Sequence, residues 1–168
     1  RLKKLITIPI DLAFFCETKF DGLSMAIYYK AGRFSHALTR GDGKTGEDVS
    51  SNIKTIRSIP LKLPENIDLC LRAEVVMPRD EFIKLNVRQE EAGAKIFANP
   101  RNAAAGTVRQ LDSGVAAERC LDAYFYDILD RENHSITTHK EAVEMLKSLG
   151  FKTDPLSTYC EGMHEIID

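Results

Sequence analysis

The sequence predicts an α+β domain with largely antiparallel sheets flanked by helices. Two observations lead to this prediction: strand patterns are mixed with helical patterns along the chain, and one pair of strands is joined by a tight turn. The 168 residues fit one domain and are enough to bury a core. With 43% hydrophobic and 29% charged residues, the composition is that of an ordinary globular protein.

Five apolar stretches have the length and composition of β-strands. In chain order they are Leu12–Glu17, Leu23–Tyr29, Arg33–Thr39, Leu69–Met77 and Leu121–Leu129. The second and third flank Lys30-Ala31-Gly32, in which the glycine permits a tight turn, so these two strands should form a hairpin.

Three stretches predict helices: Glu47–Thr55, Arg79–Glu91 and His139–Leu149. Acidic residues open the first one, where they complement the helix dipole. Pro78 is placed to begin the second helix and Gly93 to end it. The third carries apolar residues at helical spacing. Residues 94–106 are the least periodic part of the chain, and a short helix or turn is expected near Thr107–Leu111.

Charge and cysteine spacing restrict the classes of function. The net charge of −2 argues against an isolated high-affinity nucleic-acid module. Four well-separated cysteines form no C-x-x-C pair, so we expect reduced thiols that pack as small hydrophobic side chains, and no zinc cluster. The histidines show no metal-binding spacing. No apolar run is long enough to cross a membrane, and the chain starts at Arg1 without a signal segment, which indicates a piece of a longer intracellular protein.

Reactive chemistry is indicated most clearly by Glu17-Thr18-Lys19-Phe20-Asp21-Gly22, which follows the first predicted strand. In an extended chain Glu17, Lys19 and Asp21 would share one face. Two carboxylates favour the charged form of a lysine, and only about 4 in 10,000 lysines are neutral at pH 7 at the reference pKa. The arrangement therefore suits a nucleophile only if a divalent cation and a polyphosphate join the site. A surface salt-bridge pattern is the alternative.

Three further segments combine arginines or carboxylates with small residues: Thr39-Arg40-Gly41-Asp42-Gly43, Arg72-Ala73-Glu74-Val75, and residues 97–110 with Arg101 and Arg109. Arginine forks bind phosphates, and small residues let the backbone approach a ligand. If the apolar residues of the second segment face the core, Arg72 and Glu74 share the other face. Taken singly, each segment also fits a turn, a cross-strand ion pair or a solvated helix.

Together these segments resemble the adenylation domain of bacterial-type NAD-dependent DNA ligases. The resemblance rests on ETKFDG (17–22), TRGDGKTGEDVSSNIKTIRSIP (39–60), RAEV (72–75) and NPRNAAAGTVRQLD (99–112). The K-x-D-G motif is shared with ATP-dependent ligases and mRNA-capping enzymes, whereas the two long blocks are specific to the NAD-dependent group. The fold implied is a nucleotidyltransferase domain of the DNA ligase and capping-enzyme type.

The resemblance also implies roles for individual residues. Lys19 would attack the α-phosphate of NAD and form lysyl-AMP, with release of nicotinamide mononucleotide. Glu17, Arg40 and Glu74 would bind the nucleotide. Asp21, as a catalytic residue, and Glu74 would bind Mg²⁺ or Mn²⁺, directly or through water. A further pair, Arg101 and Arg109, would contact DNA or phosphate.

The same resemblance implies that residues 1–168 are a single partial domain, truncated at both ends. A nicotinamide-binding subdomain would precede it, and OB, zinc-finger, helix-hairpin-helix and BRCT regions would follow, with zinc only there. The whole protein is then expected to be a cytoplasmic, monomeric ligase acting on nicked double-stranded DNA in replication and repair. The fragment alone is expected to be inactive.

Two other functions remain open from the sequence. One is a nucleotidyltransferase that uses ATP or GTP in place of NAD. The other is a non-catalytic nucleic-acid-binding or interaction domain that kept the fold.

Overall fold

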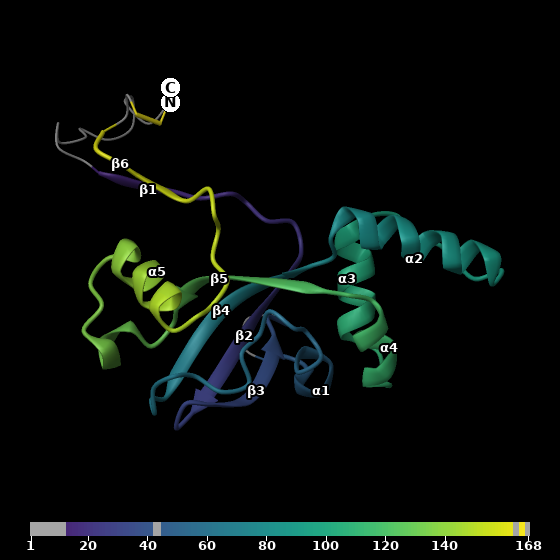
Figure 1. The fold of residues 1–168 in the computed structure, drawn as a ribbon, viewed down its shortest axis with the longest axis horizontal. Coiled ribbons are helices and arrows are strands. Elements are labelled where there is room, and N and C mark those ends of the chain that lie inside the picture. The colour runs from purple at the N-terminus through teal and green to yellow at the C-terminus, as the bar shows by residue number, and fades with distance from the viewer. Residues whose placement is uncertain (1–12, 42–44, 163–164, 167–168) are drawn as a thin grey trace. The chain divides into compact units, whose positions relative to one another are not determined.

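The computed structural model describes residues 13–41, 45–162 and 165–166. The chain divides into two compact units, one formed by Arg1–Lys19 with Asp154–Asp168 and the other by Phe20–Thr153. In the first unit, β1 (Phe14–Cys16) pairs with β6 (Thr158–Cys160) in a two-stranded antiparallel sheet (Figure 1).

The second unit is built on a four-stranded sheet. Its strands are β2 (Leu23–Lys30), β3 (Arg33–Thr39), β4 (Leu69–Val76) and β5 (Asp122–Ile128). They lie in the order β3-β2-β4-β5, and every neighbouring pair is antiparallel. The prediction of an α+β fold with antiparallel sheets is therefore confirmed.

The hairpin between β2 and β3 is also confirmed. Lys30 pairs with Arg33, so that Ala31 and Gly32 alone form the turn, with φ angles of 48° and 68°. Two consecutive positive φ values are typical of the type I′ turn, whose twist matches that of the strands. A Cβ on Gly32 would lie 2.2 Å from the carbonyl oxygen of Glu65, so this position accepts only glycine.

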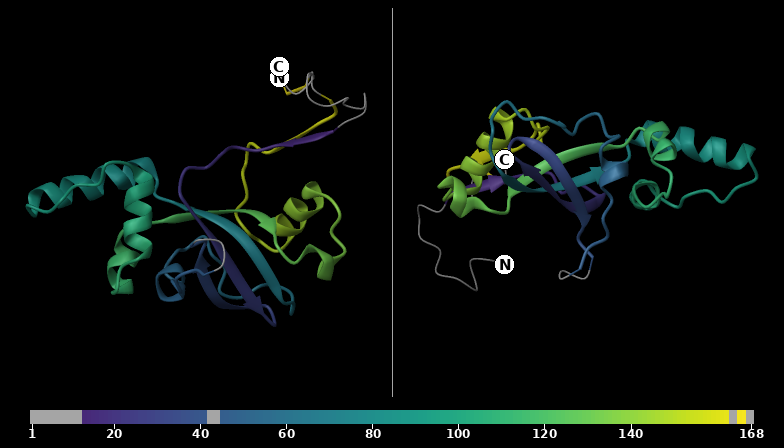
Figure 2. Two further views of the ribbon diagram at one scale, coloured as in Figure 1. Left: turned by 180° about the vertical axis from the view of Figure 1, so that it is seen from behind. Right: turned by 90° about the horizontal axis from the view of Figure 1, so that it is seen from below.

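One face of the sheet is packed against the helices and forms the core. Burial alternates along β4, where Leu71, Ala73 and Val75 are fully buried. The core on this side also takes residues from four helices, namely α1 (Ser50–Ile53), α2 (Arg79–Glu91), α3 (Pro100–Val108) and α5 (His139–Ser148). In Figures 1 and 2, α3 lies at one end of the sheet and α5 at the other.

Two helices follow their sequence signals closely. Helix α2 (Arg79–Glu91) begins after Pro78 and ends before Gly93, which has a φ of +64°, as predicted. Helix α5 buries Ala142, Val143 and Leu146 along the predicted apolar stripe. Among the described residues, no helix combines the length and the apolar character needed to cross a bilayer.

The predicted helix Glu47–Thr55 is wrong in its first turn. Helix α1 starts only at Ser50, because the preceding segment pairs with β3. The backbone N–H of Glu47 donates to Thr39 Oγ1 (3.0 Å), and Asp48 forms a bridge with Leu38. Tertiary pairing with a strand edge thus outweighs the local preference of acidic residues for a helix start.

Residues 94–106 also differ from the prediction, because they contain most of α3. The Asn99 side chain accepts a hydrogen bond from the backbone N–H of Asn102 (2.8 Å), and Pro100 occupies the first helical position. Capping asparagine and an N1 proline together favour this start. Helix α4 (Ser113–Glu118), capped by Asp112, follows it and was not predicted.

The strands of the first unit and the cysteines show smaller differences from the predictions. Within the described residues, the strand predicted over Leu12–Glu17 is limited to Phe14–Cys16 and is only half-buried. Strand β6 was not predicted. All four cysteines are free thiols; Cys160 is buried as expected, whereas Cys120 is exposed and does not pack as a core residue.

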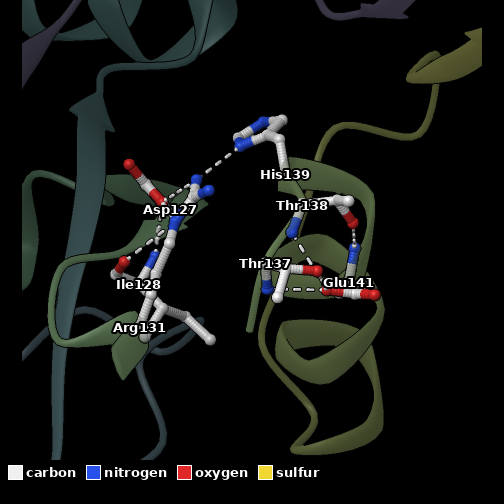
Figure 3. A network of polar contacts seen from close by, with 7 residues as sticks. All are labelled: Asp127, Ile128, Arg131, Thr137, Thr138, His139 and Glu141. Carbon is white, nitrogen blue, oxygen red and sulfur yellow. Dashed lines mark hydrogen bonds and ion pairs between the residues drawn. The ribbon is translucent and has the colours of Figure 1, made fainter. Parts of the chain in front are cut away.

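The start of α5 is fixed by a polar network (Figure 3). The carboxylate of Glu141 accepts hydrogen bonds from the backbone N–H groups of Thr137 (2.8 Å) and Thr138 (2.9 Å) and from the Thr137 hydroxyl. Arg131 donates to Asp127 at the end of β5 and also contacts the ring of His139. These contacts join the helix to the edge of the sheet.

The capping hydrogen bonds predict a pH dependence for α5. Donation from Thr137 and Thr138 lowers the pKa of Glu141 from 4.5 to about 2. A lowered pKa means that the carboxylate contributes stability above about pH 4.5, and that this contribution is lost as the pH falls toward about 2. The protection of α5 amides against hydrogen exchange, relative to the intrinsic rate at each pH, should therefore decrease over this range in the wild type and much less in Glu141→Gln. Equal pH dependence in both proteins would contradict the assignment.

Candidate functional site

The face of the sheet opposite the core carries polar and aromatic side chains. They come from alternating positions of three strands: Ser24, Tyr28, Arg72, Glu74, Tyr124 and Tyr126. Because the intervening residues of β4 are buried, Arg72 and Glu74 share this outer face, as predicted. The hydroxyl groups of Ser24 and Tyr126 lie 2.9 Å apart and share a hydrogen bond across the sheet.

A cavity of about 380 Å³ opens on the outer face, in the size range of small-molecule sites. Arg40 and Arg72 both line it. Two guanidinium groups beside one cavity provide a rigid set of donors for an anionic ligand such as a phosphate. The other lining residues are Ser24, Met25, Ala26, Tyr28, Leu38, Thr39, Thr45, Gly46 and Leu129. Residues 42–44 of the predicted glycine-rich loop lie outside the described residues.

Glu74 connects the outer face to the lysine-bearing motif. Its Oε1 accepts a hydrogen bond from the backbone N–H of Gly22 at 3.1 Å. The contact is close, since a Cβ on Gly22 would lie 2.2 Å from the carbonyl oxygen of Val75 and 2.8 Å from Val76 Cγ1. Glycine is therefore required for the segment that follows Lys19 to lie directly on β4.

An ion pair joins two of the predicted site residues. Arg101, in α3, donates to Asp21 at 3.1 Å, although the two residues are 80 positions apart in the sequence. Both side chains are more than half exposed, so the pair adds little stability. The pair places the Arg101 guanidinium beside the carboxylate of Asp21, the residue that directly precedes Gly22.

The other predicted phosphate contact, Arg109, pairs with a residue that the sequence analysis did not select. Its Nε donates to Glu47 Oε2 at 2.7 Å. The backbone of Glu47 is in turn hydrogen-bonded to Thr39, the neighbour of Arg40. Glu47 and Thr39 therefore link Arg109 to the cavity, which Thr39 lines.

The first unit contains Lys19 and Glu17, and both side chains are exposed. Residues 17–22 lie between β1 and β2, so the continuous strand on which their shared face was predicted is not formed. The backbone is nevertheless held on both sides of Lys19. Before it, Thr18 N–H donates to the buried Asp154 at 2.6 Å. After it, the Phe20 ring stacks on Tyr124 with centroids 4.1 Å apart.

The carboxylates fit a metal that is brought by a ligand rather than a metal held by protein alone. Among the described residues, no three His, Cys, Asp or Glu side chains gather as a metal-binding group. Mg²⁺ commonly binds one or two carboxylates and completes its shell with water and substrate phosphates. Asp21 and Glu74 are suited to that role, because both lie near the motif and neither is buried.

Sequence reasoning missed several residues of this surface. Tyr124 and Tyr126 were placed in a strand, but their position on the outer face follows only from the register of β5 on β4. Glu47 was assigned to a helix start, whereas it contacts Arg109. The alternation of Ala123 and Phe125 with Tyr124 and Tyr126 would have been the available signal, because it puts the two tyrosines on one face of the strand.

In the second unit, an antiparallel sheet carries an arginine-lined cavity and holds the Gly22 end of the 17–22 motif, an arrangement typical of a domain that binds anionic ligands such as nucleotides. The comparison with known families is more specific. Residues 1–168 match the family model of the NAD-dependent DNA ligase adenylation domain. The chain belongs to this family.

Curated relatives agree with the family assignment. The chain is 48% identical to the DNA ligase of Bacillus cytotoxicus over 158 residues, which is 94% of the chain. Over all 168 residues it is 47% identical to the DNA ligase of Thermosipho africanus and 48% identical to that of Thermotoga maritima. It spans about a quarter of the length of each of these relatives.

The contact between Gly22 and β4 can be tested by adding one methyl group. Gly22→Ala should push the segment after Lys19 away from Glu74, because the added Cβ meets backbone and not a flexible side chain. We expect a loss of about 1–3 kcal/mol in unfolding free energy, measured by chemical denaturation. Gly93→Ala is a useful control, since a positive φ strains it but no atom lies within 4 Å of its added Cβ. If Gly22→Ala loses no more stability than Gly93→Ala, the close packing is not important.

Proposed function

We propose that the protein carrying this chain seals nicks in double-stranded DNA with NAD as the source of AMP. The proposal rests on family membership, and above all on the anchoring of the Lys19 motif to β4 by the hydrogen bond between Gly22 and Glu74. In the first step, the Lys19 amine attacks the α-phosphate of NAD. A phosphorus–nitrogen bond forms, the pyrophosphate bond breaks, and nicotinamide mononucleotide leaves.

The next two steps transfer and then release AMP. A 5′-phosphate oxygen at the nick attacks the lysyl-AMP phosphorus, which frees the lysine and leaves an AMP group on the DNA. The 3′-hydroxyl then attacks the 5′-phosphorus, a phosphodiester bond forms, and AMP departs. Each step is an in-line displacement at phosphorus, so the protein contributes mainly positioning and neutralisation of charge.

The outer face supplies the groups for nucleotide binding. We assign Arg40 to the ribose or phosphate, since it lines the cavity as a rigid donor fork. Glu74 is assigned to the nucleotide or to the metal, and Glu17 to the adenine. Tyr126 is added from the structure, because an aromatic ring on the outer face offers a surface on which a base can stack.

The reactivity of Lys19 requires a local cation. Glu17 and Asp21 flank Lys19 in the sequence, and a lysine amine can act as a nucleophile only without its proton. A bound Mg²⁺ or Mn²⁺ would neutralise charge on the phosphates and on these carboxylates. We assign Asp21 and Glu74 to hold the metal, directly or through water.

The DNA is assigned to the side of the site where the remaining arginines lie. Arg101 and Arg109 are exposed and carried by or next to α3, so they can reach phosphate oxygens of a nicked duplex. In this arrangement nicked DNA would compete with Asp21 for Arg101 and with Glu47 for Arg109. Phosphate contacts of this kind position the duplex without reading its sequence.

The chain is proposed to be one part of an adenylation domain within a longer, monomeric protein. Its remaining regions would include the nicotinamide-binding subdomain and the zinc-containing and DNA-binding parts expected from the family. Since NAD and chromosomal DNA are both inside the bacterial cell, we place the protein in the cytoplasm.

Adenylation of Lys19 is the direct test. The full-length protein, incubated with NAD and Mg²⁺, should gain one AMP group on Lys19, located by peptide mass spectrometry. Lys19→Ala should abolish the adduct. Lys19→Arg should abolish it too, because a guanidinium remains protonated near neutral pH and cannot act as the nucleophile.

The controls separate the competing functions. Labelling with ATP but not with NAD would show an ATP-dependent nucleotidyltransferase. Labelling with neither nucleotide, in a protein that still binds nicked DNA, would favour a non-catalytic binding domain. Lys54→Ala is a matched control, since Lys54 is exposed and its amine lies over the Phe34 ring. The Lys54→Ala protein should be adenylated on Lys19 at the wild-type rate.

A further inference from the structure

The buried side chain of Asn52 holds the backbone on both sides of Arg109. Its Nδ2 group donates to the carbonyl oxygen of Val108 and to that of Gln110, each at 2.7 Å. Only 4% of Asn52 is exposed. Its Oδ1 accepts no hydrogen bond from the described residues, so these contacts depend on the amide nitrogen alone.

The two carbonyl groups lie where a helix end needs partners. Helix α3 ends at Val108, and the last carbonyls of a helix have no partner within it. Asn52 reaches them from α1, 56 and 58 positions earlier in the sequence. Both of its N–H groups are used, so a single side chain fixes the carbonyl groups of the two residues on either side of Arg109.

The side chain of Arg109 is only weakly fixed in orientation by its own contacts. It is 52% exposed and forms an ion pair with Glu47, which is itself 61% exposed. Exposed pairs of this kind hold a long side chain only weakly. The direction in which Arg109 leaves the protein surface is therefore set mainly by its backbone, and the backbone is held by Asn52.

We propose that Asn52 is a positioning residue for the reaction, which acts by directing Arg109 toward the phosphate that it contacts. This inference rests on the proposed function, since it needs a phosphate for Arg109 to bind. Asn52 itself is buried beneath the surface and touches no substrate. Loss of its two hydrogen bonds would allow the 108–110 segment to move, and small displacements of a phosphate-binding group cost substantial rate.

The test is a double-mutant cycle in the full-length protein. Lysyl-AMP formation from NAD, AMP transfer to nicked DNA and sealing are each measured as single-turnover rates and as KM for NAD or nicked DNA. Asn52→Ala should impair the same step as Arg109→Ala, by between about tenfold and about a hundredfold. In the Arg109→Ala background, Asn52→Ala should change that step by less than about twofold, because no arginine remains to be positioned.

Two variants separate positioning from general loss of structure. Asn86→Ala is the matched control, because Asn86 also bridges a helix to a backbone segment, through hydrogen bonds to Phe97 O and Phe97 N of 2.9 Å each. It should lower the melting temperature without coupling to Arg109. Asn52→Ser keeps one donor and replaces Asn52→Ala in the cycle if the alanine variant does not fold.

The outcomes distinguish this inference from the proposed function. If the wild type forms no lysyl-AMP with NAD, the proposed function fails and the role of Asn52 fails with it. If the wild type seals nicks but the Asn52 variants lose the same factor with and without Arg109, Asn52 is only structural. An unchanged rate in a folded Asn52 variant would likewise overturn the inference.

Discussion

The hydrogen bond from the Gly22 N–H to the Glu74 carboxylate is the contact on which the rest of the site depends. It joins Gly22, at the end of the 17–22 motif, to a central strand of the sheet, whose other face is the core. The contact needs glycine at one end, because any side chain would collide with the backbone of β4. It also needs an outward-facing position at the other end, which the alternation of β4 provides.

Charged residues that are distant in the sequence contact one another in the second unit through exposed ion pairs and not through buried contacts. Asp21 meets Arg101, and Arg109 meets Glu47, in exposed ion pairs that contribute little to stability. Firm positioning comes instead from buried groups beneath the surface, such as the amide of Asn52 behind Arg109. Buried hydrogen bonds thus fix the backbone from which the exposed side chains extend.

Local sequence patterns correctly predicted the elements whose conformation depends on a few neighbouring residues. The hairpin follows from Ala31-Gly32, α2 from Pro78 and Gly93, and the outer position of Glu74 from the period of a strand. Prediction failed for Glu47 because distant pairing decides its structure: it has the composition of a helix start, but it pairs with β3, which no window of sequence shows. Helix α3 is a different case, since its start is marked locally by Asn99 and Pro100 and only its weak apolar periodicity hid it.

The sequence by itself determined the α+β class and the family, because these depend on residue types at fixed spacings. Only the tertiary structure decided which carboxylate contacts which cation. It also decided that Asn52 bonds the carbonyl groups on either side of Arg109 and that Phe20 stacks on Tyr124. The physical reason is the antiparallel register: it sets which residues of β2, β4 and β5 lie side by side. Register arises from the packing of the whole core, so no single segment encodes it.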